Sequence, residues 1–153
     1  MDLPLLITML ATCVIVVLCV LLHYEGLRGL SRWVTTELLP PRWRITTLIF
    51  GLILLHSAEI WLFAFGYFLL ENVTGYADFL HLGFGEGMVE RSMSLFDHAY
   101  YSAVVYTTLG FGDIVPVGAV RLLTGTEAVT GLGMITWSAS FVFLEMQRYW
   151  GRD

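Results

Sequence analysis

One short segment of the sequence combines the residue types needed to coordinate a cation through backbone oxygens. It reads Thr107-Thr108-Leu109-Gly110-Phe111-Gly112-Asp113. Gly110 and Gly112 can adopt left-handed backbone conformations, so successive carbonyl groups can point the same way rather than alternate. The carbonyl oxygens of residues 108–111, with the Thr108 hydroxyl, would then form a ladder of hard oxygen ligands. Four chains around one axis would turn this ladder into rings that replace the water shell of a cation.

A second copy of Leu-Gly-Phe-Gly lies upstream, between His81 and Gly87. No pair of threonines precedes it, and polar residues follow it. No apolar span separates it from the copy at 109–112, so it cannot be a second repeat of the same loop. We interpret this copy as a Gly-rich external loop.

Three ionisable side chains fall within apolar stretches, where burial in lipid would be costly. His56 and Glu59 are three residues apart and therefore share one helix face. Counting residues along the helices places Glu127 at a similar depth, so we expect the three side chains to face one another. The main interpretation is a hydrogen-bonded strut between helices. A proton-sensitive coupling through His56 is the alternative.

The same residues raise the question of a metal-dependent enzyme. Zinc sites take three or four protein ligands, whereas His56 and Glu59 supply only two. No other apolar stretch offers a histidine at a matching depth, and His81 and His98 fall outside these stretches. The sequence therefore predicts neither an enzyme nor a cofactor.

Membrane helices are the elements that must position these residues. The chain has 153 residues, of which 57% are hydrophobic and 14% charged, and its mean hydropathy is +0.73. Three stretches, 3–22, 45–70 and 117–144, are apolar and long enough to cross a hydrocarbon core of about 30 Å. We expect an integral membrane protein that has lipid as a partner and does not bind nucleic acid.

The distribution of charge indicates how the chain is oriented. Four of the eight basic residues, all of them Arg, lie between the first two stretches, and the segment between the second and third is acidic. By the positive-inside rule, the N-terminus lies outside and the C-terminus is cytoplasmic, in a plasma or bacterial inner membrane. The linker after the first stretch places Leu27, Leu30 and Val34 at helical spacing. This pattern predicts a short amphipathic helix on the cytoplasmic surface, or a connector packed on the bundle, ended by Pro40 and Pro41.

A half-length helix is expected directly before the glycine-containing loop. Ser94 is a candidate N-cap with Asp97 three residues later, and the apolar residues 95–106 are too few to cross the membrane. The chain should therefore enter from outside, turn, and return as extended backbone. The carbonyl end of the short helix would point inward and favour a cation.

The segment Thr107 to Asp113 resembles the selectivity-filter signature of the potassium channels, Thr-Thr-Val-Gly-Tyr-Gly-Asp. The resemblance extends from about residue 45 to 145, over two of the three apolar spans, and the chain looks like the two-span pore module of that family with an extra N-terminal transmembrane helix. It implies an all-α homotetrameric channel in which residues 108–111 bind K⁺. Gly131 falls where the family often has a gating-hinge glycine, and close packing between helices is the alternative role for this residue. The expected units are an N-terminal helix and linker at 1–44 and a pore domain at 45–153, divided into an outer helix 45–70, an external loop 71–94, a pore helix 95–106, a filter 107–113 and an inner helix 117–146.

Two departures from the family pattern bear on selectivity. Phe111 lacks the hydroxyl with which the family's Tyr braces the filter, although Tyr100 and Tyr101 supply aromatic bulk nearby. Val104 stands where some relatives place a pore-helix Glu, so Asp113 would lack that partner. The expected function is passive K⁺ conduction. A weakly selective cation channel and a non-conducting, channel-like regulatory subunit are the alternatives.

Overall fold

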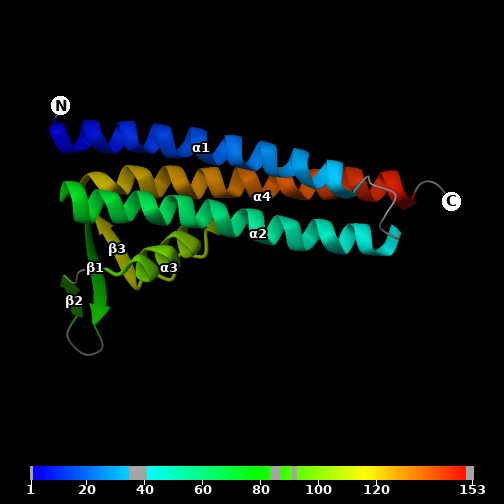
Figure 1. Cartoon of the computed structure of the whole chain (residues 1–153). Helices are drawn as coiled ribbons and strands as arrows, with labels where there is room; N and C mark the ends of the chain where they lie inside the picture. The colour runs from blue at the N-terminus through cyan, green and yellow to red at the C-terminus, as the bar shows by residue number, and fades with distance from the viewer. Residues whose placement is uncertain (1, 35–40, 84–86, 91–92, 151–153) are drawn as a thin grey trace.

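The computed structural model describes residues 2–34, 41–83, 87–90 and 93–150 (Figure 1). The elements in chain order are α1 (Leu3–Val34), α2 (Pro41–Leu69), η1 (Leu70–Thr74), β1 (Asp78–Gly83), β2 (Gly87–Glu90), α3 (Leu95–Tyr106), β3 (Ile114–Val117), η2 (Gly118–Val120) and α4 (Arg121–Trp150). The fold is mainly helical, as the sequence predicts.

Three long helices run side by side, and each is long and apolar enough to cross a membrane. Helices α1 and α4 pack on each other and on α2, which runs antiparallel to both (Figure 1). The N-terminus lies at the same end of the bundle as the strands, and the C-terminus lies at the opposite end. The number of spans predicted from composition is therefore confirmed.

Helix α1 is longer than the apolar stretch at 3–22. It continues without a break from Leu3 to Val34, so residues 25–34 extend the first span instead of forming a separate helix on the membrane surface. Leu27 and Val34 are buried, and this places the segment on the bundle as a packed connector. Pro41 begins α2, a position where proline is tolerated because the first helical N–H has no intrahelical partner. The predicted helix end at Pro40 lies outside the described residues.

Glycines allow α1 and α2 to approach closely at three levels. A Cβ atom on Gly26 would lie 2.6 Å from the Leu55 side chain, and one on Gly51 would lie 2.3 Å from the Leu30 side chain. Near the other end, a Cβ on Gly66 would lie 2.4 Å from Ile15. Small residues at helix contacts in membranes bring backbones together in this way. The N-terminal helix is thus docked on α2 from the level of Gly51 to that of Gly66.

The segment between α2 and α3 contains strands that the sequence did not predict. Strands β1 and β2 form an antiparallel hairpin in which Leu82 pairs with Met88, and β3 pairs with the other edge of β1. The second Leu-Gly-Phe-Gly copy therefore includes the end of β1, and its residues 84–86 lie outside the described part of the chain. The interpretation of 71–94 as a loop is wrong for these strands.

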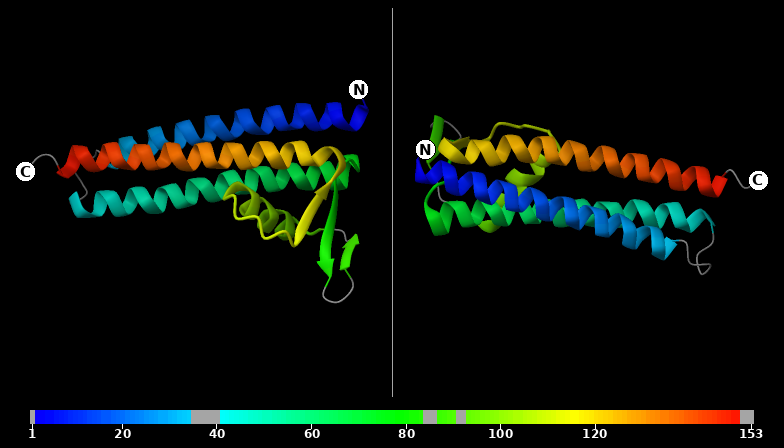
Figure 2. Two further views of the ribbon diagram at one scale, coloured as in Figure 1. Left: turned by 180° about the vertical axis from the view of Figure 1, so that it is seen from behind. Right: turned by 90° about the horizontal axis from the view of Figure 1, so that it is seen from above.

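Helix α3 lies in the angle between α2 and the sheet, on the side of the bundle away from α1 (Figure 2). The largest buried cluster joins it to α1, α2 and α4, through residues that include Phe63, Tyr67, Tyr101, Tyr106 and Leu123. This cluster holds the short helix at a fixed depth beside the three spans.

Candidate functional site

The N-terminus of α3 is capped as the sequence predicts. The Ser94 hydroxyl accepts a hydrogen bond from the backbone N–H of Asp97 at 3.2 Å, and the Asp97 carboxylate accepts one from the backbone N–H of Ser94 at 2.8 Å. This reciprocal pair satisfies two backbone donors that a helix start would otherwise leave open. The helix then runs twelve residues to Tyr106, and the loop follows directly at Thr107.

The loop backbone alternates in handedness. Thr108, Gly110 and Gly112 have positive φ angles of 58°, 63° and 77°, whereas Leu109 and Phe111 between them do not. An extended chain of uniform handedness points successive carbonyls to opposite sides, so an alternating chain can point them to one side. Thr108 is the one described residue other than glycine with a positive φ, a conformation that costs a β-branched residue free energy. Such strain is concentrated at functional sites.

The loop is exposed along its length. Residues 107–112 are all exposed in the single chain, and the Leu109 and Phe111 side chains are 58% and 64% exposed. The backbone on the α3 side is anchored, since the N–H of Leu109 donates to the Val104 carbonyl at 2.9 Å. One edge of the loop is thus fixed to the short helix, and the rest remains available to a ligand or to other copies of the chain.

Asp113, at the far end of the loop, is held from two sides. The Tyr100 hydroxyl donates to its carboxylate at 2.8 Å, and the backbone N–H of Leu82 in β1 donates to its carbonyl at 2.8 Å. The hydrogen bond to Asp113 raises the pKa of Tyr100 above its ordinary value, so the phenol remains a donor. Val104 leaves Asp113 without the pore-helix Glu of some relatives, and Tyr100 supplies a different partner. The contact with β1 was not predicted, because it joins segments on opposite sides of α3.

Gly131, the candidate hinge, lies on α4 against the end of α3. A Cβ atom at this position would lie 2.2 Å from the backbone oxygen of Tyr106. Its neighbours along α4, Gly125 and Gly133, have open space at the corresponding position. The structure therefore gives Gly131 a packing role, and the hinge stays a prediction.

Glu127 lies in one of two buried polar clusters behind the loop. Its carboxylate accepts hydrogen bonds from Tyr67 of α2 and Ser102 of α3. The Ser102 hydroxyl also lies 2.9 Å from the Ile60 carbonyl, so these two acceptors share its single hydrogen. Tyr101 reaches α4 separately, through Thr124 at 2.9 Å. This cluster fastens the middle of α3 to the flanking spans, in the manner of the predicted strut. It does not include His56, which was predicted to face Glu127.

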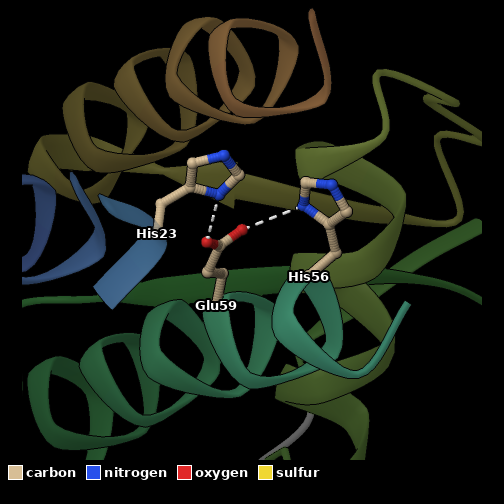
Figure 3. A group of neighbouring side chains, drawn as sticks. All are labelled: His23, His56 and Glu59. Carbon is tan, nitrogen blue, oxygen red and sulfur yellow. Dashed lines mark hydrogen bonds and ion pairs between the residues drawn. The ribbon is translucent and has the colours of Figure 1, made fainter. Parts of the chain in front are cut away.

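Glu59 is the centre of the second cluster, which joins His56 as predicted and a residue that was not expected (Figure 3). The Nδ1 atom of His56 lies 2.9 Å from Glu59 Oε2, and the Nδ1 atom of His23 lies 2.7 Å from Glu59 Oε1. Tyr106 also donates to the Glu59 carboxylate. The statement that no other span offers a histidine at matching depth is wrong, because α1 continues past residue 22 and carries His23 into the bundle.

A sequence signal for His23 did exist. The buried residues of α1 recur at helical spacing, Ile15, Cys19, His23 and Leu27 being four residues apart in succession. His23 belongs to this stripe and is fully buried, as is Glu59. The end of the apolar stretch at Leu22 concealed the pattern, since it suggested that the helix had reached the membrane surface.

The three ligand-type side chains also meet the spacing of a metal site. One atom each from His23, His56 and Glu59 lies within 4.8 Å of the others. Two imidazoles and a carboxylate are a known donor set for zinc. The two nitrogen-to-oxygen distances of 2.7 and 2.9 Å are, however, those of hydrogen bonds, which indicates protons between the atoms.

Comparison with protein families gave one finding. A family model described as "Ion channel" matches residues 42–148, which include α2, α3, the loop and most of α4. Helix α1, with His23, lies before the matched region. No curated protein and no solved structure matches the chain.

Proposed function

The chain belongs to the family of ion channels whose model covers residues 42–148, and from this premise we propose that it conducts K⁺ passively through a tetrameric ring of backbone carbonyls. The oxygens of residues 108–111 would replace the water shell of the ion. Asp113 would attract cations to the external mouth. The N-terminus would lie outside the cell membrane and the C-terminus in the cytoplasm, as the arginine-rich linker predicts.

The alternating handedness of residues 108–112 is the observation that carries this proposal. A loop that only turned would need one or two positive φ angles, whereas a run of coordinating carbonyls needs them at every second residue. The positive φ of Thr108 supports the same interpretation, because no turn chemistry favours a threonine there.

The incompleteness of the single chain supports the proposed homotetramer. One loop offers a single carbonyl at each level, whereas a dehydrated K⁺ needs oxygens on all sides. The exposure of Leu109 and Phe111 supports an assembly in which neighbouring chains cover them.

The first test is the reversal potential of purified, reconstituted protein with K⁺ on one side and Na⁺ on the other. A strongly K⁺-biased potential is expected. Gly110→Ala should abolish it, because alanine resists the φ of 63° that the carbonyl ladder needs. Gly75→Ala is the matched control, since Gly75 has a φ of 65° in the turn after α2 and equally open surroundings.

Each outcome of this test separates the candidates. Loss of current in both glycine variants would indicate general instability rather than a role for the loop. Equal permeability to K⁺ and Na⁺ would favour the weakly selective cation channel, for which the missing hydroxyl on Phe111 is the specific reason. No flux from the wild-type protein would favour the non-conducting subunit.

A further inference from the structure

The cluster around Glu59 connects four helices of the chain. His23 comes from α1, His56 and Glu59 from α2, Tyr106 from the last turn of α3, and Ser138 from α4. The Ser138 hydroxyl lies 3.1 Å from Nε2 of His56 and 3.5 Å from Nε2 of His23. Ser138 therefore lies between the Nε2 atoms of the two rings. Glu59 lies between their Nδ1 atoms (Figure 3).

A count of hydrogens shows that this network is one proton short when both histidines are neutral. An ionised carboxylate only accepts, so both Nδ1 atoms must carry a hydrogen to bond Glu59. The Tyr106 hydroxyl also lies 3.0 Å from Nδ1 of His56, but it donates its single hydrogen to Glu59 and can only accept from that nitrogen. A neutral ring that is protonated at Nδ1 has a bare lone pair at Nε2. Ser138 has a single hydrogen and can serve only one of the two Nε2 atoms. The other would face the hydroxyl oxygen with no hydrogen between them.

One additional proton completes the network. A ring that is protonated on both nitrogens donates to Glu59 and to the Ser138 oxygen, while Ser138 donates to the other ring. We propose that His23 and His56 share one such proton, and that its binding ties α4 to α1 and α2 and so regulates the pore. This regulation rests on the proposed channel function, but the proton site itself does not.

Charge balance in the buried site supports a proton over a metal ion. One imidazolium beside the Glu59 carboxylate gives a net charge of zero, whereas a divalent metal would leave an excess of one positive charge. A tetrahedral metal would also hold its donor atoms about 3.3 Å apart, wider than the 2.7 and 2.9 Å observed. Among the residues that the structure describes, the other titratable groups that interact electrostatically with Glu59 or Tyr106 are Cys19 of α1 and Glu127 of α4, and neither supplies a cation.

The position of the cluster links its protonation to the structure of the pore. Tyr106 bonds Glu59 and directly precedes Thr107, so the cluster is fixed to the start of the carbonyl loop. Ser138 lies seven residues beyond Gly131, which packs on the backbone of the same Tyr106. Loss of the proton removes the hydrogen from one contact to Ser138. The link between α4 and the other helices should therefore weaken as pH rises.

The proton site can be tested without any current, by nitrogen-15 NMR of the histidine rings in the full chain in lipid nanodiscs. The chain has four histidines, and His81→Gln and His98→Gln identify two of the signals. Near neutral pH, the signals of His23 and His56 together should show one doubly protonated ring for the pair. Two neutral rings from about pH 5 to pH 9 would overturn the proposal, as would stoichiometric zinc in the purified protein that His23→Gln removes.

The coupling is tested by the pH dependence of K⁺ flux. The midpoint is the pH at which K⁺ flux is half of its maximum. In both His23→Gln and Ser138→Ala this midpoint should differ from that of the wild type by about one pH unit, a tenfold change in proton affinity. His81→Gln, a histidine of β1 outside the cluster, is the matched control and should leave the midpoint in place. A pH-independent wild-type flux, or midpoints that do not differ among these variants, would overturn the coupling. Absence of flux from every variant would contradict the channel function, and the NMR titration would still decide the proton site.

Discussion

The backbone oxygen of Tyr106 lies 2.2 Å from the position that a Cβ atom would take on Gly131. The end of the short helix and the middle of α4 can therefore touch only because residue 131 has no side chain. This contact sets how deep Tyr106, and the loop that follows it, lie beside the inner helix. The neighbour is a backbone atom, which cannot rotate away as a flexible side chain would.

Replacing Gly131 with alanine should accordingly destabilise the protein by about 1–3 kcal/mol, as overpacked cores do. Thermal unfolding in detergent, followed by circular dichroism, measures the effect. Gly125→Ala is the matched control, because open space surrounds that position and alanine favours a helix interior. Equal unfolding temperatures for the two variants would contradict the packing role. Loss of current without loss of stability would instead support the predicted hinge.

Tyr100→Phe should impair conduction while leaving the fold intact. The change removes only the hydroxyl that donates to Asp113 at 2.8 Å, so the outer end of the loop loses one of its two supports. We expect a fall of roughly threefold or more in K⁺ flux from reconstituted protein, since hydrogen bonds to charged groups are among the stronger ones. Tyr24→Phe on the exposed side of α1 should leave flux unchanged.

The raised pKa of Tyr100 gives this contact a defined pH range. At pH values below the pKa of tyrosine in the unfolded chain, near 10, the protonated Tyr100 stabilises the folded contact. This stabilisation is lost as the pH rises through the raised pKa of Tyr100 in the folded protein. The difference in K⁺ flux between wild type and Tyr100→Phe should thus be constant from neutral pH to about pH 10. A difference that disappears at neutral pH would show that the hydrogen bond is not formed in the membrane.

Ser102→Ala should test the strut around Glu127. The variant leaves one oxygen of a buried carboxylate without its hydroxyl donor, at an expected cost of about 1–3 kcal/mol in the free energy of unfolding. Ser140→Ala is the control, because the Ser140 hydroxyl is exposed and bonds only the Thr136 carbonyl of its own helix. An unfolding temperature that drops no further than in the control would mean that Glu127 keeps a satisfied site without Ser102.

Local sequence signals accounted for much of this architecture. The Ser94 cap, the length of α3 and the three spans depend on residues that are close in sequence, and all three appear as predicted. The order of threonines and glycines likewise indicated a loop of special backbone geometry. Such features depend on chain length, capping chemistry and backbone sterics, which a single sequence displays directly.

Features that depend on packing between distant segments were missed. The contact between His23 and Glu59 joins residues 36 apart and requires α1 to continue beyond its apolar stretch and to dock on α2 through Gly26 and Gly51. The pairing of β1 with β3, which fixes Asp113 through Leu82, needs strands on both sides of α3 to meet. Neither the rotation of a helix nor the partner of a strand can be read from local spacing.

Phe111→Tyr addresses whether the loop of this chain selects K⁺ without the family's tyrosine hydroxyl. Here the outer end of the loop is held through Asp113, by Tyr100 and by β1, and the Phe111 ring is 64% exposed. If these contacts and the alternating backbone fix the positions of the carbonyl groups, a hydroxyl on residue 111 adds little to the selectivity for K⁺ over Na⁺. The ratio of K⁺ to Na⁺ permeability should then change by less than about twofold.

The ratio is obtained from reversal potentials of the reconstituted variant under the same ion gradients as the wild type. Phe96→Tyr, on the exposed outer turn of α3, controls for the addition of a hydroxyl elsewhere on the short helix. A clear rise in K⁺ preference in Phe111→Tyr alone would mean that the wild-type loop is loose for lack of this hydroxyl. The weakly selective cation channel would then be the better description, because the backbone supports at Asp113 would have proved insufficient to hold the carbonyl rings at the size of K⁺.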